Sequence, residues 1–188
     1  MRVIAVASLL LVLAACGSGS TSTTSATSTP TTSSTEAATT STSGSPGSTT
    51  AVSVPVTHPT AHLVAVRAAR QDGFDRVVFE FSEQVPGYKV AWTPKPLMAT
   101  SGKEVTLAGT AALVVRMEQA SGFDLDKGKP TYTGAKTVQP LGTEHVQELA
   151  QVEDFEAVLS WGLGAKAEVP FRVSTLASPP RLVIDLLS

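Results

Sequence analysis

Histidine is the residue type best suited to metal or acid–base chemistry, and two of the three histidines in this 188-residue chain lie four positions apart. His58 and His62 have the spacing with which a helix presents two imidazoles to one metal ion. The zinc-peptidase form of this motif needs a Glu directly after the first histidine, where this chain has Pro59. The surrounding sequence shows no helical pattern. We interpret the spacing as chance and predict neither a metal site nor a cofactor.

Two acidic clusters could also do chemistry. Residues 124–128 place Asp at the first and third positions of a calcium loop, but the glycine comes one residue early and Ala135 stands where the closing Glu belongs. A solvated turn is the better interpretation. Glu153 and Glu156 could suggest glycosidase chemistry, but glycosidase carboxylates must flank a bond from opposite sides. We predict a charged turn and no enzymatic activity; a hydrolase would need both glutamates and a histidine to converge in one cleft.

Aromatic side chains on strands raise the question of a sugar-binding surface. An exposed Trp or Tyr ring can stack on a pyranose, whereas a buried one contributes a large apolar area to the core. Trp161 alternates with Leu159 and Leu163, which predicts a core position. Trp92, next to a proline-rich break, is open between core and surface. Tyr88 on the same expected strand joins it as a candidate contact.

Arginines give the second set of candidate contacts. Arg76 and Arg181 each follow a turn and open an apolar strand. Structural ion pairs with nearby aspartates, Asp185 among them, are the default interpretation. The alternative is that these guanidinium forks hold carboxylates of a ligand. The candidate ligand-binding residues are therefore Tyr88, Trp92, Arg76 and Arg181.

The elements that must position these residues are short strands. Apolar and polar residues alternate through Val77, Phe79 and Phe81, which places these three on one face. Glycine and proline punctuate the chain, and Gly162 with Gly164 is expected to form a turn. Residues 122–142 are expected to form a long excursion. The expected strands are 62–70, 76–81, 88–93, 105–107, 113–117, 146–152, 155–163, 169–176 and 182–187. Residues 146–152 also fit a helix, but we favour a strand.

Many short strands with closely spaced turns predict an all-β fold, an antiparallel β-sandwich. It is expected to occupy residues 61–188 as one domain. Lys and Arg number 14 against 16 Asp and Glu, so the chain lacks the positive surface that nucleic acid requires, and we predict no nucleic-acid partner. Residues 17–50 are dominated by Ser and Thr and cannot bury a core. We expect residues 16–60 to be a disordered tether.

The N-terminus predicts export. Arg2 precedes an apolar run of signal-peptide length, too short to span a membrane, and the sequence then reads Leu-Ala-Ala-Cys up to Cys16. This resembles the bacterial lipobox, which implies a signal peptide over 1–15 and acylation of Cys16, with palmitate among the acyl chains expected there. A plain secretory signal with a spare thiol is the alternative. Acylation would anchor the chain to the extracytoplasmic face of the cell membrane.

Five segments carry a resemblance to a known family. They are 73–81 (GFDRVVFEF), 86–88 (PGY), 154–164 (DFEAVLSWGLG), 170–173 (PFRV) and 176–185 (LASPPRLVID). Together they resemble the AMIN-like domain of bacterial envelope lipoproteins, over essentially all of residues 61–188.

Related AMIN domains are non-catalytic β-sandwich modules that target cell-wall amidases and envelope machines to peptidoglycan. The resemblance implies a non-catalytic, membrane-anchored lipoprotein that binds peptidoglycan or another wall glycan. The alternative is a module that recruits or regulates an envelope enzyme as a protein partner, by strand addition at a sheet edge.

Overall fold

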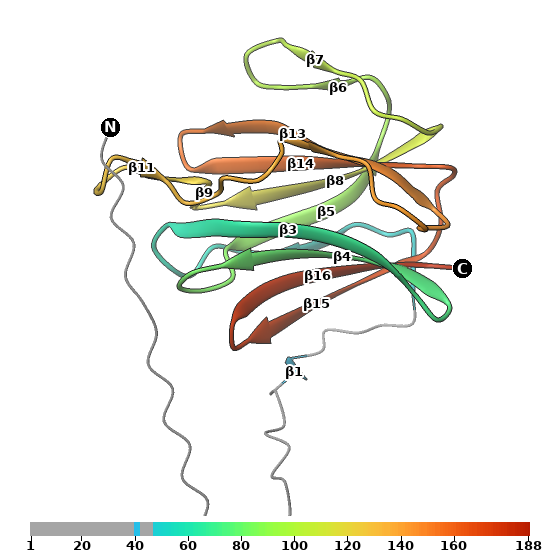
Figure 1. Cartoon of the computed structure of the whole chain (residues 1–188), viewed down its shortest axis with the longest axis horizontal. Helices are drawn as coiled ribbons and strands as arrows, with labels where there is room; N and C mark the ends of the chain where they lie inside the picture. The colour runs from blue at the N-terminus through green and yellow to red at the C-terminus, as the bar shows by residue number, and fades with distance from the viewer. Residues whose placement is uncertain (1–39, 42–46) are drawn as a thin grey trace, which may run out of the picture. The chain divides into compact units, whose positions relative to one another are not determined.

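The computed structural model describes residues 40–41 and 47–188 (Figure 1). The predicted signal peptide, Cys16 and most of the predicted tether lie outside these residues. Within the described part the regular elements are strands, and no helix is long and apolar enough to cross a membrane. The strands are β1 (Thr40–Ser41), β2 (Val52–Val54), β3 (Ala61–Gln71), β4 (Phe74–Phe81), β5 (Gly87–Thr93), β6 (Leu97–Met98), β7 (Glu104–Val105), β8 (Ala111–Glu118), β9 (Ala120–Ser121), β10 (Phe123–Asp124), β11 (Lys129–Pro130), β12 (Thr137–Val138), β13 (Val146–Phe155), β14 (Val158–Ala165), β15 (Phe171–Ala177) and β16 (Pro180–Leu187).

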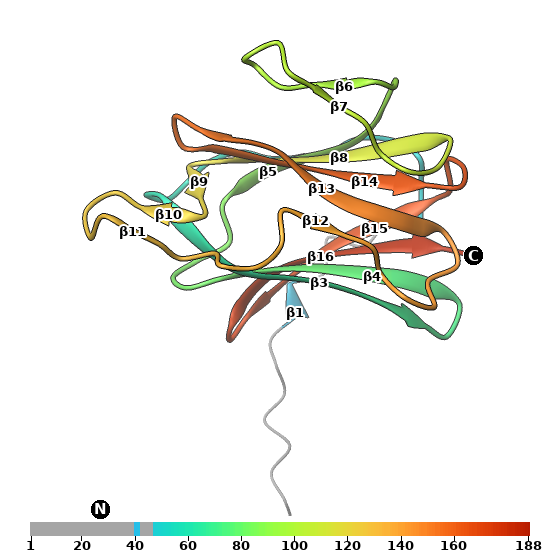
Figure 2. The ribbon, with the colours of Figure 1, turned by 45° about the horizontal axis from the view of Figure 1, so that its top comes forward.

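Two six-stranded sheets pack face to face, which confirms the predicted β-sandwich (Figures 1 and 2). The first sheet has the order β1-β15-β16-β4-β3-β9, and the second has the order β12-β13-β14-β8-β5-β2. Pairing is antiparallel throughout both sheets except between β3 and the short β9. The strand predicted over 146–152 is confirmed as part of β13.

The core lies between the sheets because inward and outward residues alternate along each strand. In β4, Val77, Phe79 and Phe81 point inward and are at most 1% exposed. Trp161 of β14 is fully buried, as predicted, and packs edge-to-face on Phe79 with 6.0 Å between ring centroids. Tyr132 also packs edge-to-face on the same indole, with 5.7 Å between ring centroids. Each large apolar side chain buried in this way stabilises the fold by about 1.5–3 kcal/mol.

The outward face of β14 carries two glycines where another segment crosses it. The excursion between β5 and β8, here called the β6–β7 arm, lies on the outer side of the second sheet (Figure 2). A Cβ on Gly162 would lie 2.6 Å from side-chain atoms of Leu97 and Leu107, and one on Gly164 would lie 2.2 Å from the Ala108 carbonyl oxygen. The turn predicted at these glycines is therefore wrong: they lie within a strand and permit close packing of the arm.

Strand pairing begins upstream of residue 61, the predicted start of the domain. β1 pairs with β15, β2 pairs with β5, and Ser48 exchanges two backbone hydrogen bonds with Phe171. Edge pairing needs only backbone groups, so the Ser/Thr-rich composition did not reveal it. The tether prediction is corrected over residues 47–60, parts of which belong to the sandwich. Within the described part of the chain, all residues of both buried clusters lie within 47–188, so this fragment contains the core that they form.

The predicted excursion over 122–142 is present as a mostly irregular segment with three two-residue strands. β10 and β11 form a hairpin, and β12 pairs with the edge of β13. Tyr132 from this segment packs against the main core. The excursion thus covers part of the core while its hairpin remains near one end of the sandwich (Figure 2).

Candidate functional site

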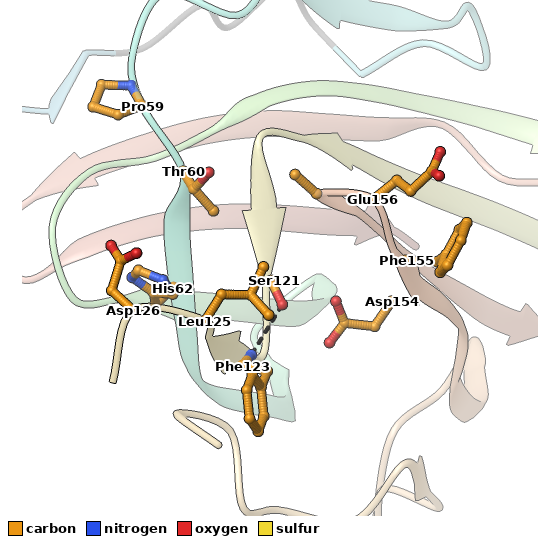
Figure 3. Close-up of a pocket in the computed structure, with 11 residues that line it drawn as sticks. Pro59, Thr60, His62, Ser121, Phe123, Leu125, Asp126, Asp154, Phe155 and Glu156 are labelled. Carbon is orange, nitrogen blue, oxygen red and sulfur yellow. Dashed lines mark hydrogen bonds between the residues drawn. The ribbon is translucent and has the colours of Figure 1, made fainter. Parts of the chain in front are cut away.

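A pocket of about 710 Å³ opens at the end of the sandwich where β3 begins and the β13–β14 hairpin turns (Figure 3). Three segments far apart in the sequence build it. The chain entering β3 contributes Pro59, Thr60 and His62. The β9–β10 region contributes Ser121, Phe123, Leu125 and Asp126. The β13–β14 hairpin contributes Asp154, Phe155, Glu156 and Ala157.

Apolar side chains stand exposed around this pocket. Phe155 is 63% exposed, Phe123 is 38% exposed, and Leu125 is 86% exposed. Large apolar groups that are gathered rather than scattered mark an interaction site. Two phenyl rings at the rim of a concave site provide faces on which a flat apolar surface of a ligand can stack.

Non-glycine residues with positive φ lie at the pocket rim and, at Gln119, outside the pocket lining. Glu156 and Ala157, the two central residues of the β13–β14 hairpin, have φ of 50° and 59°, and Gln119 has φ of 53°. In the described part of the chain these are the non-glycine residues with positive φ. Positive φ at both Glu156 and Ala157 is the geometry that a two-residue hairpin turn favours, although glycine or asparagine usually occupies such positions. Hydrogen bonds hold them: Ala120 N donates to the Ala157 oxygen at 2.9 Å, and Ala61 N donates to the Gln119 oxygen at 2.8 Å.

Hydrogen bonds with residues outside the pocket hold two of its polar residues, His62 and Asp154. The Glu83 carboxylate accepts a hydrogen bond from His62 N at 3.1 Å and contacts His62 Nδ1 at 3.2 Å. Burial would raise the pKa of Glu83, but hydrogen bonds from Ser82 and His62 outweigh it and lower that pKa. Asp154 accepts a hydrogen bond from Gly122 N at 2.9 Å. With Asp126 and Glu156 also lining the cavity, the site offers apolar rings beside hydrogen-bond acceptors.

The predicted aromatic contacts lie elsewhere. Tyr88 is 5% exposed and belongs to the main core, so its prediction as a stacking platform is wrong. Burial raises the pKa of the Tyr88 hydroxyl. Trp92 is half-buried: its ring packs edge-to-face on Phe171, and its indole N–H donates to the Val169 carbonyl at 3.3 Å. Both rings point inward from β5, toward the sandwich interior rather than the pocket.

The predicted arginine contacts do not converge on one another. Arg76 forms a bidentate pair with Asp185 at 2.7 and 2.9 Å, which confirms the structural ion pair. The hydrogen bond to Asp185 raises the pKa of the Arg76 guanidinium. Arg181 instead donates to the carbonyl oxygens of Ser178 and Pro179. Neither arginine lines the pocket.

The other motifs considered from the sequence separate in space. His62 lines the pocket described here, whereas His58 lines two smaller pockets, and among residues 40–41 and 47–188 no cluster of ligands could hold a metal ion. Glu153 lies under the β6–β7 arm, where it accepts from Thr100 N at 2.9 Å, and Glu156 lies at the pocket. The turn predicted over 124–128 is confirmed, although Asp124 is buried against Lys127 rather than solvated.

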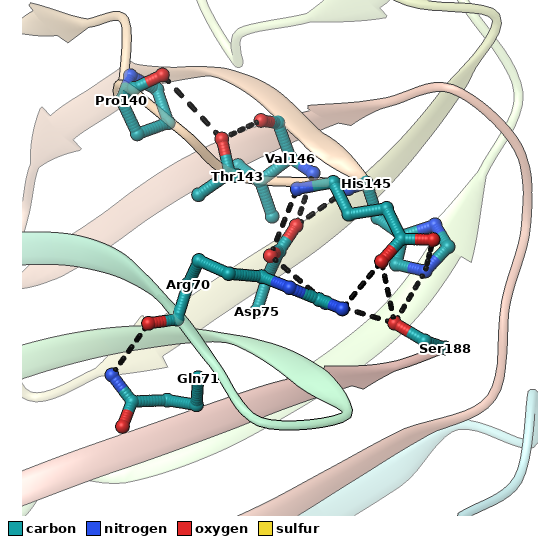
Figure 4. Close-up of polar contacts among 9 residues, drawn as sticks. Arg70, Gln71, Asp75, Pro140, Thr143, His145, Val146 and Ser188 are labelled. Carbon is teal, nitrogen blue, oxygen red and sulfur yellow. Dashed lines mark hydrogen bonds and ion pairs between the residues drawn. The ribbon is translucent and has the colours of Figure 1, made fainter.

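A second polar cluster lies at the opposite end of β3 (Figure 4); its Asp75 is one of the aspartates expected to pair with arginine, but its burial was not predicted. Asp75 is fully buried and accepts backbone hydrogen bonds from Glu144, His145 and Val146 at 3.0, 2.6 and 2.9 Å. Burial would raise the pKa of Asp75, but these donors and the nearby Arg70 charge lower it. The only sequence signal was an aspartate at an inward position of a strand.

The pocket residues were also missed. Phe123 and Leu125 lie in a segment rich in Asp and Gly that was interpreted as a solvated loop, and Phe155 was assigned to a strand. The available signal was a set of large apolar residues in segments otherwise typical of turns. Nothing local indicated that the two segments meet at one end of the fold.

These observations define the class of protein: a two-sheet β-sandwich module with a ring-lined pocket at one end. The chain belongs to the AMIN-like domain family, whose model matches residues 61–188. Comparison with curated proteins gives no match, and comparison with solved structures gives none.

Proposed function

We propose that this protein is a non-catalytic lipoprotein, anchored through acylated Cys16 at the extracytoplasmic face of the cell membrane, whose domain binds peptidoglycan or another wall polymer in the pocket. The observation that carries the proposal is the gathering of exposed rings and acceptor groups at one end of an AMIN-like domain.

The chemistry of the pocket suits a glycan. A pyranose ring has an apolar face of C–H groups, which stacks on phenyl rings, and an edge of hydroxyl and amide donors, which carboxylates accept. Phe123 and Phe155 supply the rings, and Asp126 and Glu156 supply acceptors. The carboxylates disfavour an anionic group at this position. We therefore assign the sugar backbone of the polymer, rather than a carboxylate-bearing side chain, to the pocket.

Binding without catalysis fits the separation of the acidic groups. Glu153 is occupied by Arg116 and Thr100 under the β6–β7 arm, so it does not face Glu156 across a bond. The His62 imidazole is held by Glu83. The pocket is open at one end of the sandwich, as a site for a long polymer must be.

Sedimentation of the 47–188 fragment with purified, protein-free peptidoglycan tests the proposal. We expect the wild-type fragment to sediment with the wall and Phe155→Ala to lose about tenfold in affinity, the size of effect typical of one stacking contact. The control is Leu141→Ala, which removes an apolar side chain that is even more exposed, at 95%, and that does not line the pocket. Absence of wild-type binding would overturn the proposal and favour a protein partner, to be sought by crosslinking in cells.

Anchoring requires its own test. In cells fed radiolabelled palmitate, the full chain is expected to carry label and to sediment with membranes. Cys16→Ala removes the only thiol of the chain and is expected to abolish the label. Label that persists in Cys16→Ala would contradict the assignment of this cysteine.

A further inference from the structure

The outer face of the first sheet carries one arginine on each of four adjacent strands. Arg67 lies on β3, Arg76 on β4, Arg181 on β16 and Arg172 on β15. The strand register places Arg76 opposite Asp185, and Asp185 opposite Arg172, in one row across the sheet. Inward neighbours such as Val77 and Ile184 are fully buried, so the arginines share the outward side.

The carboxylates on this face are fewer and less exposed than the arginines. Arg67 pairs with Glu80, and Arg76 pairs with Asp185. The Asp185 side chain is 7% exposed, against 40% for Arg76 and 42% for Arg172. The charges of these two ion pairs cancel. The guanidiniums of Arg172 and Arg181 then give the face a surplus of positive charge toward solvent.

Part of this charge is fixed in position. The guanidiniums of Arg76 and Arg172 both lie over the ring of Phe74, at 5.0 and 5.6 Å from its centroid. Arg172 also lies 3.6 Å from Asp185, which Arg76 already holds in a bidentate pair. A cation held over a ring and beside a shared carboxylate loses less side-chain entropy when it meets a partner.

The geometry of the surface favours a planar partner. The Cα atoms of Arg172 and Arg181 lie about 14 Å apart. Arg172 is opposite Asp185 on β16, Arg181 lies four residues earlier on β16, and each residue of a strand adds about 3.4 Å. Small or β-branched residues such as Ala69, Val78 and Val183 lie between the arginines, and the Phe74 ring on this face lies beneath the guanidiniums of Arg76 and Arg172. A layer of anionic headgroups matches spread positive charges on a flat face.

We propose that this arginine face docks the domain on a membrane surface of anionic phospholipid. The upstream chain supports this choice of partner over a soluble polyanion, since β1 and Ser48 both join the sheet at β15, the strand that carries Arg172. The segment that leads toward the predicted anchor thus meets the domain at the edge of this face. A few arginines bind weakly alone, but a tether raises their effective concentration. The pocket is lined by other residues, so docking does not depend on wall binding.

Vesicle sedimentation of the 47–188 fragment, which carries no acyl chain, tests the proposal. At low ionic strength we expect binding to vesicles of equal parts phosphatidylcholine and phosphatidylglycerol, and none to phosphatidylcholine alone. The double variant Arg172→Gln/Arg181→Gln is expected to lose binding about tenfold or more. The control Lys89→Gln/Lys166→Gln removes the same charge from exposed positions outside the face and is expected to lose less than threefold.

Further variants and a second binding partner keep the test decisive. Arg172→Lys/Arg181→Lys, which keeps the charge, is expected to restore most of the binding, and Phe155→Ala is expected to leave it unchanged. Equal losses in the arginine and lysine double variants would overturn the proposal, because net charge alone would then explain binding. Retention on immobilised polyglutamate with no binding to anionic vesicles would also overturn it and assign the face to a soluble polyanion.

Discussion

Strands β3 and β13 each run from one end of the sandwich to the other, and the side chains at the two ends differ in kind. At one end, Asp75 is buried among backbone donors, and Arg70 pairs with it at 3.5 Å. At the other end, Phe155 and Leu125 stand in solvent beside carboxylates. In the first cluster, the polar groups are hydrogen-bonded or ion-paired with one another. In the second, ring faces and carboxylate acceptors remain exposed to solvent.

Polar groups and backbone strain play different parts at the two ends of the sandwich. A buried carboxylate that accepts three backbone hydrogen bonds fixes the loop before β13 to the start of β4, which is a structural role. The hairpin at the rim of the pocket instead costs stability, since Glu156 and Ala157 hold positive φ without being glycine.

Among substitutions within the two clusters, the largest expected effect on stability is at Asp75. Asp75→Ala removes the acceptor of three backbone N–H groups, one of them fully buried, and should lower the free energy of unfolding by about 2–4 kcal/mol. Urea denaturation of the 47–188 fragment measures it. The control is Asp72→Ala, an exposed residue in the adjacent turn, expected to change stability by less than about 0.5 kcal/mol. Equal effects of the two substitutions would remove the structural role of Asp75.

The same carboxylate should make stability depend on acid. The pKa of Asp75 is lowered in the folded state, so its contribution is fully present above its unfolded pKa of about 3.9 and is lost as pH falls through the folded value. The melting temperature of the wild-type fragment should therefore fall below about pH 4.

Asp75→Asn tests the cause of this acid dependence. It should give a melting temperature that depends less on pH over the same range, with a residual slope from Glu83, Asp124 and Glu153, whose pKa values are also lowered. An unchanged slope in Asp75→Asn would assign the acid sensitivity to those other groups.

How far the sequence predicts these regions follows from the range of the interactions. Alternation within a strand is local, so the burial of Phe79 and the core position of Trp161 were predictable. Gly162 and Gly164 were misinterpreted because a glycine that signals a turn and a glycine that admits a crossing segment look alike in sequence.

The two ends of the sandwich depend on contacts across long stretches of chain. Asp75 meets a loop about 70 residues downstream, as its contacts with Glu144 and His145 show. The pocket joins three segments that only the folded topology brings together. Tyr88 failed as a surface candidate for the same reason, because the parity of β5 turns it inward.

The strained end offers a substitution expected to stabilise the protein. Ala157→Gly relieves a left-handed conformation that costs an L-residue about 1–2 kcal/mol, less the entropy that glycine loses on folding. The net gain should be about 0.5–1 kcal/mol in urea denaturation. Ala69→Gly, at an exposed position of β3, makes the same change without positive φ and should destabilise by a similar amount. A loss of stability in Ala157→Gly would mean that the hairpin is not strained.

The smallest effect on stability is expected at the exposed rings. Phe155→Ala removes a side chain that is 63% exposed, so the free energy of unfolding should change by less than about 0.5 kcal/mol. Phe81→Ala makes the identical change at a ring that is 1% exposed and should cost about 3–5 kcal/mol. Because Phe155→Ala is expected to weaken wall binding while leaving the fold intact, its stability and its binding must be measured on the same preparation. A destabilisation that approached that of Phe81→Ala would make the Phe155 ring part of the packing, and the two ends of the sandwich would then no longer differ in the way proposed.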